Sequence, residues 1–174
     1  IEGNNITSYN LGIGDGSNGN DNLFYSRRIG RSPHGSATLE EGWYADTPTA
    51  TTILGAAKVT GKTDKGLSIG VMEAITGNEY ATIDTIGGRI SQLVEPVTNY
   101  FVGRLRKDFN EGNAILGGIV TAVNRDLDAS NQDYLHESAY TGGIDYLQYF
   151  KEKKWELSLS AAFSRGAGTK EAIQ

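Results

Sequence analysis

The stretch Asn99–Asn124, NYFVGRLRKDFNEGNAILGGIVTAVN, decides the fold because it reads as two strands of about ten residues joined by a tight turn at Asn110–Asn113. If Glu111-Gly112 is a two-residue loop, the register places Phe109 opposite Ala114. One face of the pair is then almost entirely apolar, whereas the other receives the charges of the first strand. The pattern predicts an amphipathic β-hairpin.

This register also fixes which side chains share a face. On the apolar face, the predicted pairs are Lys107 with Leu116, Leu105 with Gly118, Gly103 with Val120, and Phe101 with Ala122. On the opposite face, Arg104, Arg106 and Asp108 face Ile119, Gly117 and Ile115. Lys107, next to the turn, is the one charged residue that this register places on the apolar face.

One further hairpin is predicted on each side of this one. Residues 51–77 give strands ILGAAKVTGKT and LSIGVMEAITG around Asp64-Lys65-Gly66, a three-residue loop with Gly at the left-handed position. Glu73 breaks the pattern, since it falls on the apolar face unless a bulge intervenes. Residues 139–165 alternate most cleanly, with Phe150 opposite Trp155 across the turn 151–154.

The segments between the hairpins are long and polar. Residues 78–96 are expected to form a loop that could hold one helical turn around Ile90–Val94, and residues 125–138 a second loop. Leu23–Arg31 is predicted to be one strand. We therefore divide the chain into a Gly/Asn-rich loop, 1–22, and a segment of antiparallel hairpins, 23–174, with hairpins at 51–77, 97–127 and 139–165.

The sequence offers few candidate sites. Arg27, Arg28 and Arg31 either form an anion or glycan-acid site or are structural charges paired with acidic neighbours. Oxygen-bearing side chains in residues 10–22 are one alternative, as ligands for calcium; they are Asp15, Ser17, Asn18, Asn20 and Asp21. No bidentate Glu follows them at the spacing of an EF-hand, which favours a plain loop. His34 and His136 have no ligand-spaced partners, so no metal site, cofactor or catalytic residue is predicted.

Composition excludes some classes of function. The 174 residues carry a net charge of −5 and no Cys, which removes disulfides, thiolate catalysis and thiolate metal sites. No basic stripe of the kind that nucleic acid requires is present. No apolar run approaches the roughly 18 residues of a transmembrane helix. The ends lack an initiator Met or a signal peptide, and we interpret the chain as a piece of a longer protein.

The spacing of turns points to an architecture. Turns of about three or four residues alternate with connections of about fourteen to nineteen, the asymmetry typical of outer-membrane barrels, whose strands have an apolar outer and a polar inner face. We therefore predict an all-β fold, an antiparallel up-and-down transmembrane β-barrel, present here as a fragment of a larger barrel. Arg27, Arg28, Arg104 and Arg106 would line its polar interior.

A family resemblance supports this prediction. The segments LFYSRRIGRSP, ILGAAKVTGKT, GVMEAITGNEYA and VEPVTNYFVGRLRKDFNEGNAILGGIVTAVNRDL resemble the C-terminal outer-membrane β-barrel domain of unknown function that follows family-nine carbohydrate-binding-like domains in Bacteroidetes-type bacteria. The resemblance implies a location in the bacterial outer membrane, with lipid, glycan and other outer-membrane chains as partners. It supplies no catalytic residues.

Three functions follow as hypotheses. The first is a barrel segment serving transport, export or surface assembly, including that of glycans. The second is a soluble all-β carbohydrate-binding module that stacks sugars on Trp43, Tyr44 and Trp155. The third is a glycoside hydrolase, which needs two carboxylates about 5–9.5 Å apart. The carboxylates considered for it, among which no pair stands out, are Glu40, Glu41, Glu73, Glu95 and Asp145.

Overall fold

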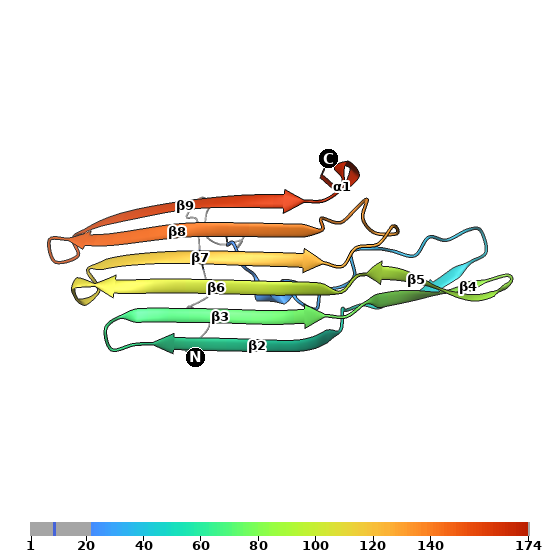
Figure 1. The fold of residues 1–174 in the computed structure, drawn as a ribbon, viewed down its shortest axis with the longest axis horizontal. Helices are drawn as coiled ribbons and strands as arrows, with labels where there is room; N and C mark the ends of the chain where they lie inside the picture. Colours follow the sequence, from blue (N-terminus) through green and yellow to red (C-terminus); the bar gives the residue numbers. More distant parts are fainter. Residues whose placement is uncertain (1–8, 10–21, 174) are drawn as a thin grey trace.

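The computed structural model, which describes Tyr9 and residues 22–173, contains two antiparallel sheets (Figure 1). The larger has the strand order β2 (Ile53–Lys62), β3 (Leu67–Thr76), β6 (Thr98–Phe109), β7 (Ala114–Arg125), β8 (Ser138–Phe150) and β9 (Trp155–Ala167). The smaller has the order β1 (Tyr44–Asp46), β4 (Glu79–Thr85) and β5 (Gly88–Glu95). The prediction of an all-β antiparallel fold is confirmed, and the described strands form an open sheet rather than a closed barrel.

The short and long connections of the six-stranded sheet lie at opposite ends (Figure 1). At one end, here named the turn end, the three hairpins reverse within residues 63–66, 110–113 and 151–154. At the other, the long-connection end, the β4–β5 hairpin links β3 to β6, and residues 126–137 link β7 to β8. The smaller sheet extends beyond this second end.

The registers inferred from alternation are confirmed. Phe109 pairs with Ala114 and Phe101 with Ala122, as predicted for the central hairpin, and Phe150 pairs with Trp155. The three-residue loop of the first hairpin is confirmed as well, since Gly66 has a φ of 78°. Period-two alternation suffices to fix register where the two faces of a sheet differ this strongly in polarity.

Three local predictions are wrong. The turn at 110–113 lies where it was predicted, but Glu111-Gly112 is not a two-residue loop: strand pairing ends at Phe109 and Ala114, and the four residues between them contain the 3-10 segment η2 (Asn110–Gly112), with positive φ at Asn110, Glu111 and Gly112. Leu23–Arg31 is not a strand but carries a 3-10 turn, η1 (Ser26–Arg28), which is capped by the extended residue Ile29 and followed by a positive-φ glycine, Gly30.

The connection 78–96 is the third error. It holds no helical turn around Ile90–Val94 but the hairpin β4–β5, because Ala81 and Ile83 alternate with polar residues and bury one face. The oxygen-bearing residues of the predicted Gly/Asn-rich loop, Asp15, Ser17, Asn18, Asn20 and Asp21, lie outside the described residues.

Glu73 remains on the apolar face without a bulge, since the only irregularity between β2 and β3 falls at Ile53–Gly55. Its Oε1 accepts a hydrogen bond of 2.6 Å from Asn99 Nδ2. The Gln148 side chain on the same face likewise donates to the Asn113 carbonyl oxygen, at 3.0 Å. Polar residues on this face are tolerated at its margins because they are hydrogen-bonded there.

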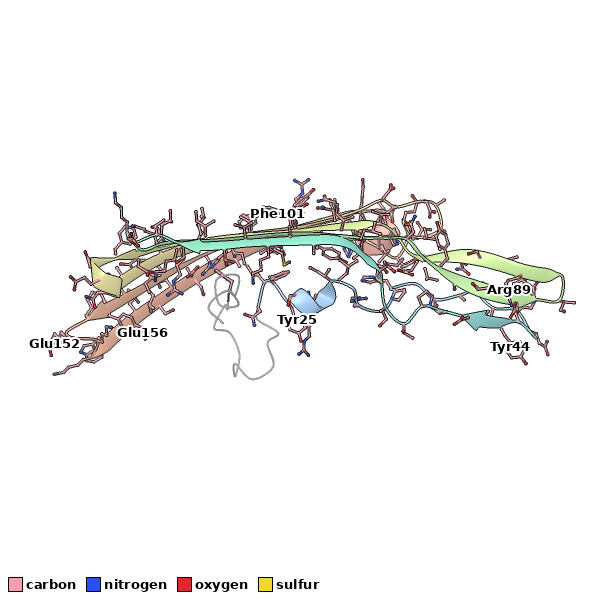
Figure 2. All side chains as sticks on the ribbon, turned by 90° about the horizontal axis from the view of Figure 1, so that it is seen from below. Tyr25, Tyr44, Arg89, Phe101, Glu152 and Glu156 are labelled. Atoms are coloured by element: carbon pink, nitrogen blue, oxygen red, sulfur yellow. The ribbon has the colours of Figure 1, made fainter. Side chains whose placement is uncertain are left out.

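The six-stranded sheet has two unlike faces (Figure 2). The apolar face lies on the side of Phe101, and none of the described residues covers it; its exposed members include Ile69, Val71, Leu105, Leu116, Val120, Ile144, Leu159 and Phe163. The polar face lies on the side of Tyr25 and carries Arg104, Arg106, Asp108, Asp145 and Lys62. A buried cluster on this polar face contains Tyr9, Val102 and Ile119, packed against Leu23, Phe24 and Met72.

The buried core therefore lies under the polar face, where residues 22–31 and Tyr9 cover it, whereas the described part of the chain leaves the large apolar surface exposed. This is the reverse of an ordinary soluble sheet, which buries its apolar face.

Candidate functional site

The centre of the polar face is an ion pair that crosses a strand. Arg104 on β6 and Asp145 on β8 are separated by β7, and their Nη1 and Oδ1 atoms lie 2.5 Å apart. Arg104 is 5% exposed. Gly117 on β7 makes the crossing possible, because a Cβ built there would lie 2.5 Å from Asp145 Oδ1 and 2.9 Å from Arg104 Nη2. A side chain at this position would push the two charges apart.

Tyr9 covers this ion pair. The Arg104 Cζ atom lies 5.1 Å from the centroid of the Tyr9 ring, within the range of cation–π attraction. The Tyr9 hydroxyl lies 2.9 Å from the carbonyl oxygens of both Ile144 and Ala161, to which it donates. The ring rests on Gly143, where a Cβ would lie 2.6 Å from Tyr9 Cζ. Two glycines thus form the floor on which Tyr9, Arg104 and Asp145 are held.

A second charged group lies nearer the turn end of the same face. Lys62 Nζ lies 3.1 Å from Asp108 Oδ2, and Arg106 Nε lies 3.9 Å from Asp108 Oδ1. The predicted candidates Arg104 and Arg106 therefore share one face, as their two-residue spacing requires. Each has an acidic partner, which fits the structural interpretation of these charges.

The other two predicted candidates lie elsewhere. Arg27 and Arg28 are exposed on η1, in the segment that covers the polar face, whereas Arg104 is buried beneath Tyr9. The structure does not bring the four arginines together into one anion site.

A buried polar cluster at the junction of the two sheets was missed by the sequence analysis. Glu95, 2% exposed, accepts hydrogen bonds from the His34 backbone N–H at 2.7 Å and its carboxylate lies 2.8 Å from the His34 ring Nδ1. Burial, the largest single influence, favours the neutral acid, but the His34 hydrogen bonds and the charges of His34 and Arg125 lower the pKa of Glu95 below its ordinary value.

The carboxylates considered for catalysis are not paired. Glu73 lies on the apolar face beside Asn99, Glu95 is hydrogen-bonded to His34, and Asp145 forms an ion pair with Arg104. Glu40 and Glu41 are exposed. Within the described residues, no group of three or more His, Cys, Asp or Glu side chains could hold a metal ion.

The aromatic residues considered for sugar stacking do not form one platform. Tyr44, 76% exposed, lies in β1 of the smaller sheet, whereas Trp155 begins β9 at the turn end. Figure 2 shows Tyr44 and Glu156, the neighbour of Trp155, at opposite ends of the molecule. No helix in the described part of the chain is long and apolar enough to cross a membrane.

Comparison with known proteins gives one family match. Residues 18–171 match the model of a domain of unknown function, DUF5916. Neither the curated proteins nor the solved structures contain a match to this chain.

Proposed function

The chain belongs to the DUF5916 family of domains of unknown function, and we propose that it forms part of the wall of a transmembrane β-barrel in the bacterial outer membrane. Such a barrel would serve transport, export or surface assembly, including that of glycans. The observation that carries this proposal is the uncovered apolar face of the six-stranded sheet. Contiguous exposed apolar patches of this kind are rare on soluble monomers, whereas barrel strands turn such a face to lipid.

Aromatic side chains border this face at both ends. Phe101 and Tyr140 lie near the long-connection end, and Phe109, Phe150 and Trp155 lie near the turn end. Tyr140 and Phe150 on β8 are about 33 Å apart along the strand at about 3.3 Å per residue. A strand tilted by about 40° reduces this to about 25 Å, the height of the apolar band of outer-membrane barrels between their aromatic girdles.

The opposite face and the connections agree with the same proposal. The Arg104–Asp145 pair and the Asp108 group would face the barrel interior, which is polar in this class of protein. The turn end would face the periplasm and the smaller sheet the exterior, because outer-membrane barrels have short periplasmic turns and long external loops.

The two outer strands, β2 and β9, would allow further strands to pair with the sheet and close it into a barrel. Within the described residues, β2 and β9 each pair on one side only. Their free backbone edges would accept further strands, from the same protein or from another outer-membrane chain, because an unpaired edge in lipid is costly.

Adjacent residues on β9 offer a sharp test. The sequence contains no Cys, so Leu159→Cys and Ser158→Cys each give a single labelling site. Both positions are exposed and they lie on opposite faces. With nitroxide labels and the complete protein in liposomes, we expect high oxygen accessibility at 159 and high accessibility to a water-soluble nickel chelate at 158.

Equal nickel accessibility at both positions, with the protein freely soluble without detergent, would contradict the proposal. Fractionation supplies an independent readout: we expect recovery in the sarkosyl-insoluble outer membrane and a heat-modifiable band on a gel.

A soluble carbohydrate-binding module is the second candidate, favoured by the high exposure of Tyr44 on β1. If the chain is such a module, Tyr44→Ala is expected to abolish its retention on a glycan column. The barrel proposal predicts that the substitution leaves membrane recovery unchanged.

A further inference from the structure

A groove runs across the middle of the apolar face. It has a volume of about 520 Å³ and an almost entirely apolar lining. Glycines from three adjacent strands line it, Gly103 on β6, Gly118 on β7 and Gly142 on β8. The Phe163 ring lies against Gly142, so the open part of the floor is at Gly118. Its walls are formed by Ile69, Val71, Leu105, Val120, Ile144 and Phe163.

The groove exists because small residues alternate with large ones across the sheet. Val120 on β7 lies between Gly103 and Gly142, and Gly118 lies between Leu105 and Ile144. At Gly118 the floor is open, since a Cβ there would meet only the Gly143 carbonyl oxygen, at 3.7 Å. The result is an apolar hollow at Gly118, bounded by Leu105, Val120 and Ile144, in which the methylene groups of an apolar chain would find contacts.

The turn end of the face carries an excess of positive charge next to this groove. Lys107 follows the wall residue Leu105 by two positions on β6; its ammonium group donates to the Lys65 carbonyl oxygen and lies 5.7 Å from the Phe109 ring centroid. The basic residues near this end are Lys62, Lys65, Arg106, Lys107, Lys151, Lys153 and Lys154, against the acidic residues Asp64, Asp108, Glu111, Glu152 and Glu156. Basic residues beside an apolar surface favour anionic lipid headgroups.

We propose that the groove holds one acyl chain of an anionic phospholipid whose phosphate lies against Lys107. This inference rests on the proposed membrane location and adds to it a specific lipid subsite. The aromatic residues at the turn end would lie at the depth of the headgroup, as aromatic belts do, and the acyl chain would extend over Gly118 towards Gly103.

Native mass spectrometry of the complete protein in dodecyl maltoside, with added phosphatidylglycerol or phosphatidylcholine, tests the subsite. We expect wild-type protein to retain phosphatidylglycerol preferentially. Gly118→Leu fills the floor and is expected to lower retention about fivefold or more, because the acyl methylenes lose their contacts. Lys107→Gln is expected to remove the preference between the two headgroups.

Gly61→Leu is the matched control. Gly61 on β2 pairs with Ile69, so it lies in the same row of the apolar face as Gly118 but outside the groove, and a Cβ there meets nothing within 4 Å. We expect this variant to retain phosphatidylglycerol as wild type does. The heat-modifiable band is measured for every variant, so that misfolding is not mistaken for lost binding.

The outcomes separate the two proposals. A protein that is freely soluble without detergent overturns the membrane location and the subsite together. A membrane protein in which Gly118→Leu and Gly61→Leu retain equal amounts of lipid overturns the subsite alone. A wild-type dimer that Gly118→Leu dissociates, with no lipid bound, overturns the subsite in favour of a second copy of the chain in the groove.

Discussion

At the residue scale, glycines decide which charged side chains can meet on the polar face. The Arg104–Asp145 pair crosses β7 only because Gly117 has no Cβ. We expect Gly117→Val to lower the free energy of unfolding by about 2 kcal/mol, since overpacking separates a largely buried pair. Gly118→Ala on the opposite face is the matched control, with its Cβ in ordinary contact. Equal urea midpoints for the two variants would contradict this account.

Also at the residue scale, Glu95 gives the fold an acid-sensitive contact. Its pKa in the folded state is lowered, so its carboxylate stabilises the fold fully above the unfolded pKa of about 4.3. This stabilisation by the Glu95 carboxylate is lost as the pH falls from the unfolded-state pKa through the lower pKa that Glu95 has in the folded state. We expect the unfolding free energy of wild type to fall more steeply between about pH 5 and pH 3 than that of Glu95→Gln. Parallel pH profiles for the two proteins would rule out this role of Glu95.

At the element scale, the hairpin turns depend on positive φ angles to different degrees. Gly66 and Gly112 have φ of 78° and 84°, but only Gly66 is also crowded, because a Cβ there would lie 3.0 Å from the Asp108 carbonyl oxygen. We expect Gly66→Ala to cost about 2 kcal/mol and Gly112→Ala about 1 kcal/mol. Chemical unfolding of both variants measures the difference; a larger loss at Gly112 would show that crowding at Gly66 is unimportant.

The elements also show what the sequence could and could not predict. The long hairpins were predictable with their registers because most residues of Phe101 to Phe109 and of Ile144 to Phe150 alternate between apolar and polar positions, with Lys107 and Gln148 as exceptions on the apolar face. The β4–β5 hairpin was missed because its strands are shorter than those of the large sheet and their apolar alternation is weak: Ala81 and Ile83 mark the buried face of β4, and on β5 only the last two residues, Val94 and Glu95, are buried. The contacts of His34 with Glu95 and of Tyr9 with Arg104 join residues far apart in sequence, and no local spacing reports such pairs.

At the scale of the whole molecule, a charge introduced on the apolar face is expected to lower the free energy of unfolding more if that face lies in lipid than if it lies in water. Val120 lies at the middle of that face and is 52% exposed, whereas Phe150 lies at its aromatic border. In a bilayer, Val120→Lys is expected to cost about 2–4 kcal/mol and Phe150→Lys about 1 kcal/mol or less. For a sheet in water, Val120→Lys would be nearly neutral. Unfolding from liposomes distinguishes the two cases.

The pairing of β1 with β4 has a mechanical consequence. β1 precedes the β2–β3 hairpin and β4 follows it. Three residue pairs join β1 to β4, from Tyr44 opposite Asp84 to Asp46 opposite Thr82, and they connect the segments on either side of that hairpin. The three pairs of β1 with β4 therefore hold the chain that enters β2 close to the chain that leaves β3, so the two ends of this hairpin stay together at the long-connection end independently of its turn.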